Sequence, residues 1–290
     1  MSGKRFVPEA ARRAWRAWKR APLAIWVIPY EPGLKLQRFV LSQSWVQRLF
    51  FSRQVRLVQT WAELCSCPDQ RGAILGSLMN NTMMGWRSRA LQRPDAAARW
   101  LKVEGAENFQ QALASGRGII LLTLHTPRTG LIPYVVQRAG GKAIHRFAGR
   151  VPEGDKNILM ATYVRQIIEA QTLLQQGEVV VIGGDGLRGV SAVNLPFYGR
   201  LFPFRSGFAD LAARANASAL AVFVYYETDG RVIFEFSEAI RPGEGTREAQ
   251  VEGMAREYAR ILIERWPRLL PSLMWRKLRQ ILAMPAASER

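Results

Sequence analysis

Residues 118–125, GIILLTLH, and residues 178–184, EVVVIGG, decide the fold of this 290-residue chain. Both are unbroken apolar runs of β-forming residues flanked by glycine, which is typical of strands covered on both faces of a parallel sheet. A helical pattern lies between them, over residues 157–176, and ends at Gly177. A strand, a helix and a strand in this order predict a right-handed parallel unit. The sequence therefore predicts an α/β fold with a central, mostly parallel sheet flanked by helices.

The segment before this unit has a helical pattern. Apolar residues recur at spacings of three and four over residues 34–100, which predicts a helical N-terminal region. One helix is expected from residue 45 to 64 and another from 71 to 91, and Pro94 starts a third, shorter one.

The segment after the unit mixes strands and helices. A loop rich in glycine, proline and aromatic residues is expected up to residue 205, followed by a helix over 206–217. Residues 219–240 alternate in polarity and break at Asp229-Gly230, which predicts a hairpin with a two-residue turn. Residues 246–265 predict a C-terminal amphipathic helix.

The economical organisation is one domain with helical additions at both ends. Residues 31–290 form that domain, and residues 1–30 form a separate basic segment. Within the domain we expect a helical region over 31–104, an α/β core over 105–242, and C-terminal helices over 243–290.

The charge balance points to an anionic partner. The chain has 41 Lys and Arg against 23 Asp and Glu, a formal net charge of +18, and such a surface attracts nucleic acid or an anionic membrane. The cations gather near the termini beside tryptophans, and no recognition helix or stacking motif is visible. We therefore expect a membrane surface and no nucleic acid.

The first thirty residues favour the same partner. In residues 12–20, RRAWRAWKR, Trp15 and Trp18 lie three apart among five cations, as in helices that lie in a membrane interface. The apolar run over 21–30 is well short of the ~20 residues that a spanning helix needs. A membrane-surface anchor is predicted over 1–30, and an amphipathic helix packed on its own core is the alternative.

The sequence predicts neither a metal nor a nucleotide cofactor. Cys65 and Cys67 form a C-x-C pair whose mutual disulfide would be strained, so reduced thiols are expected. Two distant histidines are a weak supply of zinc ligands. The glycines of residues 183–186 match neither the phosphate-loop nor the dinucleotide pattern.

Two polar residues follow the predicted core strands. His125 ends the first run and Asp185 comes directly after the second. Ligands of parallel sheets bind beyond the carboxyl ends of the strands, so these side chains are expected to approach each other. A neutral imidazole with a carboxylate partner is a common general base, whereas a histidine in a purely structural role is the alternative. The other histidine, His145, is interpreted as a surface or structural residue.

Three blocks and the C-terminal segment carry a family resemblance. They are GRGIILLTLH (116–125), YVRQIIEAQTLLQQGEVVVIGGDG (163–186), LPFYGRLFPFRSGFADLAARANASALAVF (195–223) and PSLMWRKLR (271–279). In order and spacing they resemble the lipid A biosynthesis (lauroyl/myristoyl) acyltransferase family, over nearly the whole chain. That family moves a fatty acyl chain from an acyl-carrier-protein or coenzyme A thioester to a hydroxyl of a membrane glycolipid, at the cytoplasmic face of the bacterial inner membrane.

The resemblance assigns roles to individual residues and includes one departure. His125 matches the base of the family's H-x4-D/E motif, but the acid position falls on Gly130. Loss of the orienting acid costs about four orders of magnitude in turnover in serine proteases. Either Asp185, which matches the acid opening the family's D-Q or D-R segment, orients His125, or the protein is a non-catalytic lipid-binding or scaffold member. No cofactor is implied beyond the thioester donor.

Three arginines are candidates for binding an anionic ligand. Arg165 matches an arginine that the family places near its lipid-phosphate site, and Arg205 lies beside the expected cleft. Arg128, inside the histidine motif, is assigned to a headgroup or phosphopantetheine phosphate. Guanidinium groups bind phosphate bidentately, and arginines solvated on a generally basic surface are the alternative.

Overall fold

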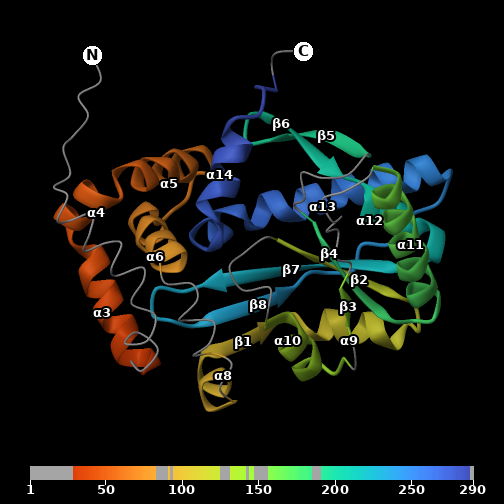
Figure 1. The fold of residues 1–290 in the computed structure, drawn as a ribbon, viewed down its shortest axis with the longest axis horizontal. Coiled ribbons are helices and arrows are strands. Elements are labelled where there is room, and N and C mark those ends of the chain that lie inside the picture. The colour runs from red at the N-terminus through yellow and green to blue at the C-terminus, as the bar shows by residue number, and fades with distance from the viewer. Residues whose placement is uncertain are drawn as a thin grey trace.

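The computed structural model describes residues 29–82, 91, 94–124, 131–141, 144–146, 156–184 and 191–287. Its elements are labelled as in Figure 1. The strands are β1 (Leu101–Glu104), β2 (Ile119–Thr123), β3 (His145–Arg146), β4 (Val179–Gly183), β5 (Ala192–Phe197), β6 (Arg200–Arg205), β7 (Ser218–Tyr226) and β8 (Val232–Phe236). The helices are α3 (Tyr30–Ser42), α4 (Ser44–Phe50), α5 (Ser52–Leu64), α6 (Gln70–Thr82), α8 (Pro94–Trp100), α9 (Ala106–Ala114), α10 (Ile132–Arg138), α11 (Lys156–Gln175), α12 (Gly207–Ala215), α13 (Arg247–Leu269), the 3-10 helix η2 (Leu270–Ser272) and α14 (Trp275–Leu282).

A six-stranded sheet forms the centre of the molecule, in the order β1-β8-β7-β2-β4-β3. Strands β7, β2, β4 and β3 are parallel to their neighbours in this series. Strand β8 runs antiparallel to β7, and β1 is parallel to β8. The prediction of a central, mostly parallel sheet flanked by helices is confirmed. Strand β1 joins this sheet from the segment before residue 105.

Strand β2 shows why its sequence is an unbroken apolar run. Ile119 and Leu121 point into the hydrophobic cluster shared with α9 and α10. Ile120 and Leu122 point into the opposite cluster, which α12 and α13 cover. Alternate side chains of a strand face opposite sides of its sheet, so helices on both sides require apolar residues at every position. All four side chains are buried.

The helices before the sheet form one body with the C-terminal segment. Trp61 of α5 donates its indole N–H to the Leu278 carbonyl (3.1 Å), and Trp275 donates its indole N–H to Ser77 Oγ (2.9 Å) on α6. The tryptophans of the C-terminal segment are therefore packing residues, and Trp266 is buried as well. No helix within the described ranges is both long enough and apolar enough to cross a bilayer.

The helix expected over residues 45–64 is wrong as one continuous element. The chain leaves helical geometry at Phe51 (φ −125°) and divides there into α4 and α5. Phe51 is buried among residues of α3, α4 and α6, next to the ring of Trp275 at 6.3 Å. The helix breaks at the residue whose ring is packed in this cluster. The apolar spacing of the sequence continues across the break, so the spacing alone does not predict it.

The loop expected up to residue 205 contains a hairpin. Strands β5 and β6 pair antiparallel, and Tyr198 (φ +48°) and Gly199 (φ +73°) make the turn between them. The β7–β8 hairpin also differs from expectation. The Glu227 N–H donates to the Arg231 carbonyl (3.0 Å), which leaves three residues, 228–230, in its turn.

Candidate functional site

The candidate site starts from the edge where β2 and β4 end. The two strands are parallel, with Thr123 in register with Gly183. Beyond the register, the Gly184 N–H donates to the Thr123 carbonyl (2.8 Å). The next residue along the chain from Gly184 is Asp185, and His125 comes two residues after Thr123. His125, Arg128, Gly130 and Asp185 lie outside the described residues.

Tyr258 of α13 reaches this edge, and the sequence did not single it out. A Cβ at position 184 would lie 2.4 Å from Tyr258 Oη and 3.3 Å from Leu122 Cβ. Gly184 is thus required by the close approach of the tyrosine. Helical spacing indicates only that position 258 faces the core. The contact depends on how α13 crosses the sheet, which is not visible in the sequence.

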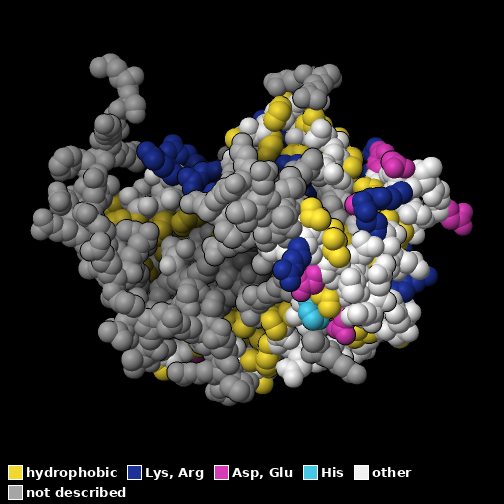
Figure 2. Space-filling view, turned by 45° about the vertical axis from the view of Figure 1, so that its right-hand side comes forward, with side chains coloured by type: hydrophobic (Ala, Val, Ile, Leu, Met, Phe, Trp, Pro, Cys, Tyr) yellow, Lys and Arg dark blue, Asp and Glu magenta, His cyan; other side chains and the backbone are white. Residues whose placement is uncertain are grey.

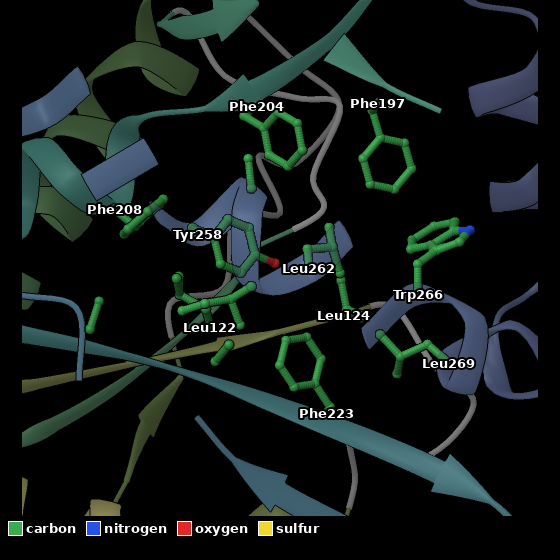
Figure 3. Packing of buried hydrophobic residues seen from close by; sticks show 14 of the residues in the cluster. Leu122, Leu124, Phe197, Phe204, Phe208, Phe223, Tyr258, Leu262, Trp266 and Leu269 are labelled. Carbon is green, nitrogen blue, oxygen red and sulfur yellow. The ribbon is translucent and has the colours of Figure 1, made fainter. Parts of the chain in front are cut away.

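The surroundings of Tyr258 are apolar. Its ring packs edge-on against Phe208 at 5.5 Å and Phe204 at 6.3 Å, and in Figure 3 it lies between Phe204 and Leu122. Leu124, the last described residue before His125, is buried in the same cluster. An apolar, water-poor wall strengthens hydrogen bonds and ion pairs at its border. The strand edge is therefore suited to chemistry that needs a positioned base.

Arg205 pairs through its strand with the residues that follow the segment containing Asp185. It is the last residue of β6 and is half-buried. Its register partner, Ala192, and the preceding Ser191 are the first described residues after the segment that contains Asp185. The Ser206 N–H donates to the Ser191 carbonyl (3.3 Å) and fixes this join. Arg205 is thus anchored beside the end of the Asp185 segment.

Arg165 lies in a different environment. It occupies the middle of α11, and its side chain is exposed between Val164 and Ile168, which are exposed as well. Helix α11 leads into β4, so it returns from the carboxyl edge of the sheet to the amino edge. Arg165 stands partway along that return path and not at the strand ends themselves.

The described histidine belongs to the opposite edge of the sheet. His145 Nε2 lies 3.6 Å from Glu178 Oε2, and both side chains are partly exposed. Glu178 directly precedes β4, so this pair is at the amino end of the strand, whereas Asp185 follows its carboxyl end. The interpretation of His145 as a surface residue agrees with this position.

The cysteines are separate from the candidate site. Cys65 and Cys67 are free thiols. Burial raises the pKa of the Cys65 thiol to about 11, and the neighbouring Cys67 adds to the shift. No three His, Cys, Asp or Glu side chains gather as a metal site in the described ranges. Because His125 and Asp185 lie outside those ranges, the expectation of no metal stays a prediction.

The fold is that of an α/β protein with a mostly parallel central sheet, and the candidate residues His125 and Asp185 follow the carboxyl ends of two of its strands in the sequence. No protein-family model matches the chain, and no curated protein matches it either. One similar solved structure is the 1-acyl-sn-glycerophosphate (LPA) acyltransferase PlsC from Thermotoga maritima. The identity is 16%, the match covers 81% of this chain and 96% of that one, and the TM-score is 0.37. This similarity is too distant to assign a reaction, and the resemblance to the lipid A acyltransferases stays a prediction.

Proposed function

We propose that this protein transfers a fatty acyl chain from an acyl-carrier-protein or coenzyme A thioester to a hydroxyl or amine of a membrane-associated acceptor such as a glycolipid. The hydrogen bond from the Gly184 N–H to the Thr123 carbonyl carries the proposal. It joins the ends of the two strands that lead to Asp185 and His125. The sequence blocks that resemble lipid A biosynthesis acyltransferases supply the reaction class.

In this proposal His125 is the general base. It takes the proton of the acceptor hydroxyl while that oxygen attacks the thioester carbonyl carbon. Asp185 replaces the motif acid that Gly130 lacks, orients the imidazole and stabilises the imidazolium. The tetrahedral intermediate then collapses, the C–S bond breaks, and the imidazolium returns its proton to the leaving thiolate. The products are an ester and a free thiol, with no further cofactor.

The arginines bind the anionic parts of the two substrates in this scheme. Arg205, anchored by its strand, is proposed to bind a headgroup or phosphopantetheine phosphate together with Arg128. Arg165, exposed on α11, binds the more distant part of a phosphorylated acceptor. The proposed location is the cytoplasmic face of a bacterial inner membrane, with the protein on the bilayer surface.

Gly130 favours a second candidate function. A glycine at the position of the motif acid suits a non-catalytic member that binds acyl chains or glycolipids, or that serves as a scaffold.

One experiment separates the two functions. Labelled acyl-carrier protein and acyl-coenzyme A are each incubated with a total lipid extract and the wild type, His125→Ala or His145→Ala. Acyl transfer by the wild type and by His145→Ala, with loss in His125→Ala, supports the enzyme. A wild type that binds acyl chains and transfers none from either donor supports the binding protein.

A further inference from the structure

The outer surface of α3 and α4 carries apolar side chains that the core does not use. Helix α3 packs one side, with Leu34 and Leu41, against α6 in a buried cluster. Its opposite side exposes Leu36, Phe39 and Val40. Residues three and four apart share a helix face, so α3 has two apolar faces and only one of them is covered. Single exposed apolar residues are normal, whereas a contiguous group marks an interaction site.

Helix α4, which begins two residues after α3 ends, also exposes apolar side chains. Trp45 and Leu49 lie four residues apart and are exposed, while Val46 between them is buried with α3 and α6. Trp45 is 63% exposed and Phe39 is 66% exposed. Exposure of two large aromatic side chains to this extent is costly unless a partner covers them. We call these five residues, Leu36, Phe39, Val40, Trp45 and Leu49, the outer face.

Hydrogen bonds fix the two helices relative to each other. Gln47 Nε2 donates to the Leu41 carbonyl (2.8 Å), and Gln43 Nε2 donates to the Phe39 carbonyl (3.0 Å). The Gln43 N–H also donates to the Val40 carbonyl (3.3 Å). These hydrogen bonds hold α3 and α4 in one arrangement before a partner binds, which lowers the entropic cost of binding.

Apart from Glu31 at the start of α3, the charges on α3 and α4 are positive. Residues 32–62 contain five Lys and Arg and no Asp or Glu. Lys35 pairs with Glu31 (3.2 Å). The other four cations, Arg38, Arg48, Arg53 and Arg56, are exposed and form no ion pair with any residue that the structure describes.

Helix α13 shows the opposite pattern. It carries five arginines and four glutamates, and every arginine forms an ion pair, some of them along the helix, as Arg256 does with Glu252 and Arg260 with Glu257. The chain therefore neutralises its charges on one helix and leaves them available around the outer face. Figure 2 shows a group of dark blue side chains at the upper left of the molecule, with yellow side chains below them.

Charge also decides which occupant fits. Residues 1–28 contain seven Lys and Arg and one Glu, so this segment would be repelled by the four unpaired arginines, and so would a second copy of a chain with a net charge of +18. An anionic bilayer satisfies both features at once, because its headgroups pair with arginine and its acyl region takes up Trp, Phe and Leu.

We propose that the outer face of α3 and α4 docks on an anionic lipid bilayer, with Phe39 and Trp45 inserted below the headgroups and Arg38 and Arg48 paired with them. This surface is distinct from the anchor expected in residues 1–30 and does not depend on acyl transfer. Its position suits a membrane-facing site. Tyr30 Oη donates to the Gly230 carbonyl (2.7 Å), just past the end of β7, and β2 runs parallel to β7, so α3 lies on the side toward which β2 ends.

Side-chain labelling by hydroxyl radicals tests the docking directly in the full chain. Labelling at each residue is measured without vesicles, with phosphatidylcholine vesicles, and with vesicles that also contain phosphatidylglycerol. We expect anionic vesicles to remove most of the labelling at Phe39 and Trp45. Ile168 on α11, 60% exposed, is the matched control and should keep its labelling.

Variants give the second measurement. Phe39→Ser with Trp45→Ser should weaken partitioning onto anionic vesicles at least about tenfold, because each large apolar side chain loses its burial. Arg38→Gln with Arg48→Gln should weaken it about tenfold, since each cation near an anionic surface contributes. Ile168→Ser is the control and should bind as the wild type does. All five positions are exposed, and circular dichroism confirms that the variants fold.

Several results would overturn the docking proposal. Unchanged labelling at Phe39 and Trp45 on anionic vesicles would mean that another segment, such as residues 1–28, makes the contact. Equal loss of labelling at Ile168, equal protection by neutral vesicles, or protection by duplex DNA at the same salt would each exclude this face as an anionic-lipid surface. None of these readouts measures acyl transfer, so their outcome is separate from that of the proposed reaction.

Discussion

Replacement of Gly184 by alanine tests the contact that shapes the strand edge. The added Cβ would lie 2.4 Å from Tyr258 Oη and 2.9 Å from its Cζ. The tyrosine ring cannot swing away, because Phe204 and Phe208 pack against it. Overpacking of this kind costs about 1–3 kcal/mol, so the free energy of unfolding of Gly184→Ala should fall by that amount.

A double-mutant cycle isolates the cause. Tyr258→Phe removes the hydroxyl oxygen that the added Cβ would approach most closely. In that background Gly184→Ala should cost about 1 kcal/mol less than in the wild type, as neighbouring residues couple. The relief is partial because Cζ remains close.

Urea unfolding followed by circular dichroism measures all four proteins. Gly253→Ala on α13 is the matched control, since no atom lies within 4 Å of its added Cβ. It should stabilise the helix by about 0.5–1 kcal/mol. Equal stability of Gly184→Ala and Gly253→Ala, or an equal cost of Gly184→Ala with and without the Tyr258 hydroxyl, would contradict a steric role of this contact.

Three further predictions concern residues away from the strand edge. Gly105→Ala should lower the urea midpoint strongly, because Gly105 has φ +66° and its added Cβ would lie 2.2 Å from the Phe236 carbonyl oxygen; an unchanged midpoint would contradict this. Iodoacetamide at neutral to mildly basic pH should modify Cys67 well before Cys65, because the pKa of about 11 keeps the Cys65 thiol protonated. Peptide mass spectrometry at intermediate times measures the order, and modification of Cys65 first would contradict the prediction. Burial raises the pKa of Glu104, but hydrogen bonds from Lys102 and Arg268 outweigh it and lower that pKa below 4.5. The stabilisation is present above pH 4.5 and is lost as pH falls through the lowered pKa, so wild type and Glu104→Gln should converge in stability in acid and differ at neutral pH.

The core strands and most helices could be predicted because their signals are local. The apolar runs of β2 and β4 reflect burial on both faces, and the helix expected over 157–176 corresponds to α11 (Lys156–Gln175) within one residue at each end. The β5–β6 hairpin was missed because Pro196 and Pro203 argue against strand structure. Both prolines sit in an isolated two-stranded ribbon, where a missing N–H is tolerated.

The candidate site could be predicted in part. Strand order places Gly184 against Thr123, as expected for neighbouring parallel strands that lead to Asp185 and His125. Tyr258 could not be found from the sequence, because it reaches the edge from a helix far along the chain. The outer face of α3 was also hidden, since a helix with two apolar faces gives no clear pattern until one face is seen to be covered.

We propose that His125 and Asp185 act as one catalytic unit, and their coupling in acyl transfer is the most direct test. Transfer from labelled acyl-carrier protein or acyl-coenzyme A to a total lipid extract is measured for the wild type, His125→Ala, Asp185→Asn and the double variant. Residues that work as a unit are strongly non-additive. We expect loss of activity in both single variants and no further loss in the double variant. Full activity in Asp185→Asn, or losses that multiply in the double variant, would contradict it.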